Sequence, residues 1–337
     1  MTPEQFNPQD YLPFGHYAWP NDVNPHIEQM GEDQALWIDT DYTYLSEEHR
    51  KKYKRMNLHY CIGRMYPYAS YEGVTPCSRF VLFQTAFDDS LEFLTKEEVC
   101  RYGERLVTIF KGAQPTPEEH GLFRQAAIIR NEYRAVMPDE WLERFIEGFI
   151  EGFHRVTKYG AAEEMPYKNS GTVPSLAYFQ ILREYSVLCI PYLYMVDVEF
   201  NSVLPKDIDE HPVIQRLRVL VSRLVGWQND FHSLMKELRM NSETMNLIIV
   251  LQRKCNLSLK DALTEAMKIN DADLAEFDAL RADLPDFGLH HKQVEQFIFG
   301  LGVMLQGLNS FYYQNTRYAS DGSGFPWPAR EQTVNHS

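Results

Sequence analysis

Apolar residues recur along most of the chain with the spacing of one face of an α-helix. From Ser46 onward they return every three or four positions, a period that indicates amphipathic helices. The clearest examples are Leu106, Ile109 and Phe110, then Trp141, Phe145, Phe149 and Phe153, then Leu217, Leu220, Val221 and Leu224. Alternation with a period of two is nowhere long enough to predict a sheet. The pattern therefore predicts an all-α fold.

Clusters of Gly and Pro divide this helical pattern into segments. Breaks are expected at residues 112–117, 138, 160–174, 205–212 and 285–288. Because no repeat or low-complexity linker divides the chain, we expect one domain of roughly ten helices over residues 36–319. Residues 1–35 are rich in Pro and Asn and are expected to form an extended arm or lid, and residues 320–337 a flexible tail.

The composition excludes some classes of partner. The formal net charge is −14, whereas binding to nucleic acid or to an anionic membrane needs a basic surface. The longest apolar run, residues 187–196, is interrupted by Pro191 and is too short for a membrane span. The cysteines are scattered without a Cys-x-x-Cys pair, and no basic stretch followed by an apolar one opens the chain. We therefore expect reduced thiols and a cytoplasmic protein.

An acidic motif lies at Asp88, Asp89 and Glu92. In a helix, Asp88 and Glu92 are four positions apart and Asp89 and Glu92 three, so their carboxylates converge on one face. A divalent cation would remove the repulsion between them, and Mg²⁺ prefers such oxygen ligands. The flanking residues 80–87 are largely apolar, which is unusual for a solvated acidic face. Taken alone, the motif leaves two interpretations open, a metal site and a solvated acidic face.

A second motif follows at Asn229, Ser233 and Glu237. Successive steps of four along a helix drift by only about 40°, so these three oxygen-bearing side chains form a narrow stripe, with Lys236 beside it. Asn and Ser are mediocre helix formers, and an ordinary polar face would not require them in the middle of a helix. The spacing therefore favours a metal site with the positively charged side chain of Lys236 next to it.

With these two motifs the chain resembles the class I terpene synthases of the microbial, single-domain type. Residues 88–92 match their aspartate-rich DDxx(x)D/E motif, and residues 229–237 match their NDxxSxx(K/R)E motif in full. Arg183, 46 positions before Asn229, matches the family's diphosphate-sensing Arg. Arg317 and Tyr318 match an Arg-Tyr pair near the C-terminus of the family. The resemblance runs from about residue 80 to residue 318.

One part of the chain departs from the family pattern. Ser186 and Val187 align with a linker position that is usually acidic and an effector position that is often Gly. The family has a helix break at this point, and Pro191 supports a break nearby.

The resemblance implies a single-domain class I terpenoid synthase-like helical bundle around a central active-site cavity. It implies three Mg²⁺ ions held by Asp88, Asp89, Glu92, Asn229, Ser233 and Glu237, with Asp88 in the direct role. It also implies a diphosphate bound by Arg183, Lys236, Arg317 and Tyr318. Candidates for the pocket lining are Phe80, Phe83, Phe87, Val187, Trp227 and Tyr312.

The implied reaction is Mg²⁺-dependent ionisation of an isoprenoid diphosphate, followed by cyclisation to a hydrocarbon or an alcohol. The substrate would be farnesyl (C15) or geranylgeranyl (C20) diphosphate, and many relatives pair as homodimers. A prenyl diphosphate synthase normally has two DDxxD motifs, whereas Asp88–Asp89 is the only adjacent Asp pair in this sequence. A protonation-initiated cyclase normally has a DxDD motif, which Asp39 and Asp41 match only in part. A non-catalytic helical interaction protein is the remaining alternative.

Overall fold

The computed structural model of the protein describes residues 6–91, 95–119, 121–159, 161–240 and 245–315. Within these ranges every regular element is an α-helix or a short 3-10 helix, and none is a strand. The all-α prediction is therefore confirmed.

The helices follow one another with short connections. The first are α1 (Ile27–Thr40), α2 (Glu47–Arg55), α3 (Leu58–Met65), α4 (Tyr71–Leu91) and α5 (Lys96–Phe110). The next are α6 (Gly121–Val136), α7 (Asp139–Tyr159), α8 (Ala161–Ser170), α9 (Leu176–Ser186) and α10 (Ile190–Phe200). The last are α11 (Lys206–Asp209), α12 (Pro212–Met240), α13 (Leu247–Cys255), α14 (Leu259–Ala282) and α15 (His291–Tyr312). Two 3-10 helices, η2 (Pro8–Asp10) and η3 (Gly288–His290), complete the set of described elements.

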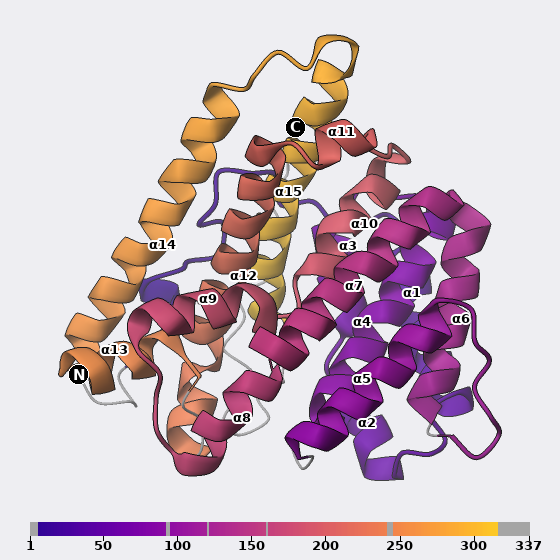
Figure 1. Ribbon diagram of the computed structural model, residues 1–337, viewed down its shortest axis with the longest axis horizontal. Helices are drawn as coiled ribbons and strands as arrows, with labels where there is room; N and C mark the ends of the chain where they lie inside the picture. Colours follow the sequence, from indigo (N-terminus) through magenta and orange to yellow (C-terminus); the bar gives the residue numbers. More distant parts are fainter. Residues whose placement is uncertain (1–5, 92–94, 120, 160, 241–244, 316–337) are drawn as a thin grey trace.

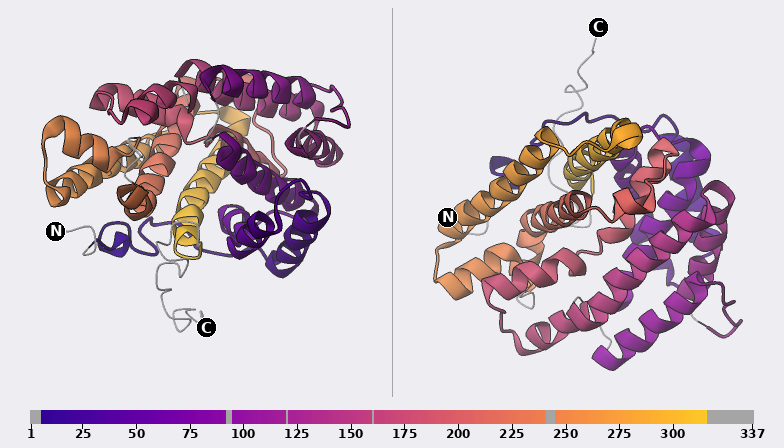
Figure 2. Two further views of the ribbon diagram at one scale, coloured as in Figure 1. Left: turned by 90° about the horizontal axis from the view of Figure 1, so that it is seen from below. Right: turned by 45° about the horizontal axis from the view of Figure 1, so that its top comes forward.

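Helix α15 runs through the middle of the bundle (Figures 1 and 2). It packs against α3 and α10 on one side and against α12 on the other. Helix α14 covers the outer side of α12, and α4 lies between α3 and α6. Helices α3, α4, α10, α12 and α15 therefore surround the interior of the molecule.

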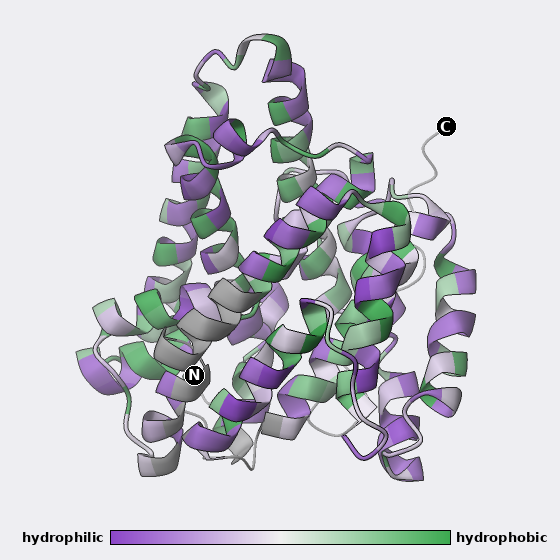
Figure 3. Cartoon of the chain, turned by 45° about the vertical axis from the view of Figure 1, so that its right-hand side comes forward, coloured by the Kyte–Doolittle hydropathy of each residue, from purple (hydrophilic) through white to green (hydrophobic). Residues whose placement is uncertain are grey.

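The apolar faces predicted by the sequence are the faces that the helices turn toward one another. Green apolar stripes and purple polar stripes alternate around the helices in Figure 3. The described side chains of all three predicted runs, from Leu106 through Trp141 to Leu224, are buried. Burial of such side chains is the main favourable contribution to folding.

Two predicted boundaries differ from the structure. Helix α1 already begins at Ile27, so residue 35 falls inside a helix and the irregular N-terminal segment covers residues 6–26 apart from η2. The predicted break at residues 160–174 was mostly wrong, because α8 occupies its first part with Pro166 inside the helix. A proline removes one backbone hydrogen bond, and α8 still packs against α5, α7 and α9. The tail at 320–337 lies outside the described residues.

No helix in the described ranges combines the length and the apolar character that crossing a bilayer requires.

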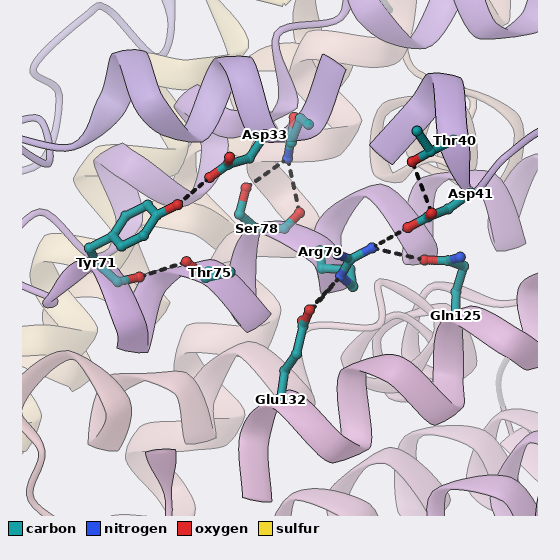
Figure 4. Close-up of polar contacts among 10 residues, drawn as sticks. Asp33, Thr40, Asp41, Tyr71, Thr75, Ser78, Arg79, Gln125 and Glu132 are labelled. Atoms are coloured by element: carbon teal, nitrogen blue, oxygen red, sulfur yellow. Dashed lines mark hydrogen bonds and ion pairs between the residues drawn. The ribbon is translucent and has the colours of Figure 1, made fainter. Parts of the chain in front are cut away.

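A buried arginine fixes helix α4 to its neighbours (Figure 4). Nη1 of Arg79 donates to Asp41 Oδ2 at 2.7 Å and to Gln125 Oε1 at 3.3 Å. Its Nε donates to Glu132 Oε1 at 2.9 Å, and its guanidinium carbon lies 4.0 Å from the centroid of the Trp37 ring. Because a buried charge is costly without partners, these contacts hold α4 firmly against α1 and α6.

Helices α3 and α15 approach each other closely at Gly307. A Cβ atom at this position would lie only 2.0 Å from the backbone oxygen of Arg64. Glycine is therefore required here by the backbone of the neighbouring helix, and it sets the distance between two walls of the interior.

We expect Gly307→Ala to lower the free energy of unfolding by about 1–3 kcal/mol, because the added methyl group would force α15 away from α3. The measurement is urea-induced unfolding followed by circular dichroism. Gly31→Ala in α1 is the matched control, since the nearest atoms to its methyl group belong to the His59 side chain, at 3.1 Å, and not to a backbone. Equal stability of the two variants would contradict the assignment of Gly307 as a close-contact position.

Candidate active site

A cavity of about 190 Å³ lies among α3, α4, α12, α15 and the junction of α9 with α10. The lining residues from α3 and α4 are Leu58, Cys61, Met65, Val81, Gln84, Thr85 and Asp88. The others are Arg183, Ser186, Val187, Leu188, Cys189, Tyr192, Val225, Asn229, Leu308, Phe311, Tyr312 and Asn315. Along α4 the lining changes from Val81 to Asp88, and along α12 from Val225 to Asn229. Charged and amide groups therefore follow an apolar wall on both helices.

The two adjacent aspartates of α4 have different surroundings. Asp88 is exposed and lines the cavity. Asp89 instead accepts hydrogen bonds at 3.0 Å from both Lys52 Nζ and Tyr53 OH, which belong to α2. Consecutive residues on a helix point about 100° apart, so one aspartate can face the cavity while the next faces α2. Glu92, the third member of the predicted motif, lies outside the described residues.

The predicted stripe of oxygen-bearing side chains lies on a continuous helix, α12. Nδ2 of Asn229 donates to Tyr312 OH at 3.2 Å. Ser233 is 3% exposed, and its Oγ atom has no hydrogen-bond partner within the described part of the chain. Glu237 and the neighbouring Lys236 are half-buried. The spacing inferred from the sequence therefore places Asn229, Ser233 and Glu237 along one side of α12.

Arg183 of α9 reaches into this stripe. Its Nη2 donates to Asn229 Oδ1 at 2.7 Å and to Asp230 Oδ1 at 2.5 Å. A Cβ atom on Gly226 would lie 3.0 Å from Cγ of Arg183, so this glycine gives the arginine side chain its path along α12. The pairing of Arg183 with the start of the second motif is thus direct.

Both members of the Arg183–Asp230 ion pair are buried. Burial raises the pKa of Asp230 to about 6, against the opposing effect of the Arg183 charge and of the Leu247 backbone N–H. Burial lowers the pKa of Arg183, but the nearby carboxylates, Asp230 first, raise it above its ordinary value. Arg183 therefore keeps its positive charge beside the cavity.

The junction between α9 and α10 forms part of the cavity wall. Helix α9 ends at Ser186, and Leu188 has a φ of 56°, in the left-handed region. Pro191 occupies the first turn of α10, where its missing N–H costs nothing. The helix break expected near Pro191 is present, with Val187 and Leu188 at its centre. A leucine with positive φ was not foreseeable from the sequence, because this region favours glycine.

The predicted aromatic lining is only partly present in the cavity. Tyr312 lines it, with its ring stacked on His232 at a centroid distance of 4.6 Å. Phe80, Phe83 and Phe87 instead line a separate, smaller pocket of about 10 Å³. The two pockets share only the wall residues Gln84 and Leu188.

Trp227 does not belong to the described cavity lining, and its prediction as a lining residue was wrong. Its ring packs near Phe179, and its Nε1 donates to Asp273 Oδ2 at 2.7 Å. Trp227 is two positions before Asn229 on the same helix, so it points to the opposite side, toward α14.

Sulfur-containing side chains form a part of the wall that the sequence did not indicate. Cys61 and Met65 come from α3, and Cys189 comes from the junction before α10. Burial raises the pKa of the Cys61 thiol, and it raises that of Cys189 to about 12. Both thiols are therefore protonated at neutral pH.

The side chains on α4 and α12 fit a hard divalent cation. Asp88, Asn229, Ser233 and Glu237 offer carboxylate, amide and hydroxyl oxygens, which Mg²⁺ prefers over nitrogen or sulfur. The buried Ser233 Oγ, which has no partner among the described residues, is an atom that a metal ion would satisfy. No group of three His, Cys, Asp or Glu side chains converges in the described ranges. The set on α12 contains only one residue of those types, Glu237.

Asp230→Asn should lower the free energy of unfolding by about 3–5 kcal/mol, because it leaves the Arg183 charge buried without its carboxylate. Chemical unfolding in the absence of metal measures this change. Asp88→Asn is the control, since Asp88 is exposed and its loss should change the free energy by less than about 0.5 kcal/mol. A small effect of Asp230→Asn would show that the ion pair does not hold α9 to α12.

The chain is similar in sequence to known terpene synthases. The model of terpene synthase family 2, C-terminal metal binding, matches residues 79–276. The chain is similar to a (+)-T-muurolol synthase from Roseiflexus castenholzii, with 23% identity over 92% of this chain and 95% of that protein. It is also similar to a 4-epi-cubebol synthase from Streptosporangium roseum, with 23% identity over 94% of this chain and 95% of that protein.

Solved structures show the same fold. A linalool/nerolidol synthase from Streptomyces clavuligerus superimposes with a TM-score of 0.76 at 19% identity, covering 87% of this chain and 98% of that one. The family match spans more than half of the chain, from Arg79 on α4 to Glu276 on α14. It therefore includes both predicted metal-binding motifs, residues 88–92 and 229–237. The chain therefore belongs to the terpene synthase family.

Proposed function

We propose that this terpene synthase ionises and cyclises farnesyl diphosphate in a Mg²⁺-dependent reaction and releases diphosphate. The observation that carries the proposal is a single cavity with Asp88, Arg183 and Asn229 next to an apolar wall. The (+)-T-muurolol and 4-epi-cubebol synthases are named as enzymes that cyclise (2E,6E)-farnesyl diphosphate, which supports a C15 substrate over a C20 one.

In this proposal the metal ions are held from two sides of the cavity. Asp88 contributes from α4 and Asn229 from α12, and both line the described cavity. Ser233 and Glu237, which are not among the described lining residues, contribute from the same side of α12. Three Mg²⁺ ions are expected from the family resemblance, and they supply Lewis-acid and electrostatic stabilisation of the departing diphosphate when bound. In this proposal Asp89 acts through hydrogen bonds and not as a direct metal ligand, since Lys52 and Tyr53 of α2 already donate to its Oδ2.

Arg183 and Lys236 supply positive charge to the diphosphate. The planar guanidinium of Arg183 can bind phosphate oxygens with two parallel hydrogen bonds. Because Asp230 also binds Arg183, the arginine keeps a partner even where the Asn229 oxygen is given to a metal ion. Glu92, Arg317 and Tyr318 lie outside the described residues, and their roles in metal and diphosphate binding stay predictions from the sequence.

The apolar wall shapes the isoprenoid chain and excludes water. A carbocation needs surroundings that do not react with it, and aromatic faces stabilise positive charge. Tyr192, Phe311 and Tyr312 are the aromatic residues that line the described cavity. The reaction then ends either with loss of a proton, which gives a hydrocarbon, or with addition of water, which gives an alcohol.

The purified protein should release diphosphate from farnesyl diphosphate with Mg²⁺ and lose this activity with EDTA. Geranyl (C10) and geranylgeranyl (C20) diphosphates serve as comparison substrates, with released diphosphate quantified and volatiles identified by gas chromatography and mass spectrometry. Faster cyclisation of the C20 substrate would overturn the C15 assignment. In a parallel reaction with isopentenyl diphosphate added as the C5 unit, a longer linear diphosphate as product would indicate a prenyl diphosphate synthase. No release of diphosphate in any of these reactions would indicate a binding protein.

Asp88→Ala and Asn229→Leu should each reduce diphosphate release at least about 100-fold, because each removes an oxygen ligand next to the departing group. Helical circular dichroism should stay as in the native protein. Glu104→Ala on α5 is the matched control, since it removes an exposed acid that does not line the cavity. Full activity in both cavity variants would refute the proposed metal roles.

A further inference from the structure

Asn246, the residue before α13, is fully buried and makes three hydrogen bonds. Its Oδ1 accepts from the backbone N–H of Ile248 at 2.9 Å, which caps the N-terminus of α13. Its Nδ2 donates to the backbone oxygen of Asp230 at 2.7 Å and to Glu237 Oε2 at 2.6 Å. The side chain is 0% exposed, so water cannot replace any of these partners.

The orientation of the Asn246 amide follows from its partners. The Ile248 N–H can only donate, so it must face the amide oxygen, and both remaining partners are acceptors. The two hydrogens of the NH₂ group are therefore used, one by the backbone of α12 and one by Glu237. A flipped amide would place donor against donor and acceptor against acceptor.

We infer that Asn246 is a positioning residue for the metal site, acting through Glu237. The inference rests on the proposed function, in which Glu237 is a metal ligand. A carboxylate that receives a hydrogen bond on one oxygen has a fixed plane, and such outer contacts orient the ligands of metal ions. Asn246 itself touches neither metal nor substrate in this role.

The same residue links the metal carboxylate to the diphosphate side of the site. Asp230 receives the Asn246 amide on its backbone oxygen and the Leu247 N–H on Oδ2, at 2.9 Å. Its other carboxylate oxygen binds Arg183. The start of α13 therefore holds Glu237 and, through Asp230, Arg183 in one connected set of hydrogen bonds.

A purely structural role as a helix cap makes a different prediction. Asp and Ser are about as good as Asn at the N-cap position, so either could still accept from the Ile248 N–H. Asp at position 246 would present an oxygen instead of an NH₂ group to Glu237, and Ser would be too short to reach it. Asn246→Asp and Asn246→Ser therefore separate the cap from the donor.

The experiment measures Mn²⁺ binding in the presence of inorganic diphosphate, from the loss of the electron paramagnetic resonance signal of free Mn²⁺ relative to protein-free samples. These samples contain the same Mn²⁺ and diphosphate concentrations, because diphosphate itself binds Mn²⁺. Mn²⁺ takes the same oxygen ligands as Mg²⁺. Both Asn246 variants should bind Mn²⁺ about 10–100-fold more weakly than the native protein. Asn270→Asp is the matched control, because it places a carboxyl group at another fully buried asparagine, on α14, and should leave Mn²⁺ binding unchanged.

Circular dichroism melts establish that each variant is folded at the temperature of the binding measurement. Should Asn246→Asp fail to fold, the uncharged Asn246→Ser variant decides the question. Native Mn²⁺ affinity in a folded Asn246→Ser protein would overturn the positioning role and leave the proposed function intact. Absence of Mn²⁺ binding by the native protein with diphosphate would instead refute the proposed metal site, and the role of Asn246 with it.

Discussion

The ion pair between Arg183 and Asp230 is the contact on which the geometry of the site depends. It joins α9 to α12 inside the molecule, where the Asp230 carboxylate is fully buried and the Arg183 guanidinium is exposed only toward the cavity. Asp230 also receives the N-terminus of α13, so three helices meet at one carboxylate. Because the guanidinium of Arg183 donates to both Asn229 and Asp230, these contacts fix the position of α9 along α12. The helix break that follows Arg183 is thereby held against the cavity.

The opposite side of the cavity is fixed by different contacts. Helix α4 is held by Arg79, which binds partners at the end of α1 and on α6. Near the C-terminal end of α4, Asp89 is bound by Lys52 and Tyr53 of α2, whereas Asp88 lines the cavity. The site is thus assembled between two separately braced groups of helices. The oxygen atoms on the two sides keep their positions because each side has its own buried or paired charges.

The sequence predicted the parts of the site that depend on spacing along one helix. Asn229, Ser233 and Glu237 share a side of α12 because of helix periodicity alone, and Arg183 could be placed by its distance from Asn229 in the family pattern. Apolar periodicity likewise predicted the all-α fold. The helix periodicity is local, so a single sequence contains it, whereas the placement of Arg183 needed the family pattern.

The features that could not be predicted depend on how distant segments meet. Trp227 and Phe83 look equally suitable for a pocket, and only the rotation of their helices turns them away from the cavity. Nothing in the sequence shows that α13 returns to Glu237 and brings Asn246 with it, although an Asn before an apolar run is an ordinary helix start. Helix α8 formed despite Pro166 because its packing outweighs one lost hydrogen bond.

The cysteines of the cavity wall have a chemical consequence for a reaction that forms carbocations. A thiolate would be the strongest nucleophile in such a pocket, and an electrophilic carbon would alkylate it irreversibly on contact. The apolar surroundings that raise the pKa of Cys61 and Cys189 hold both sulfur atoms in their poorly nucleophilic protonated form. The burial of the wall thus leaves both sulfur atoms in the less reactive of their two protonation states.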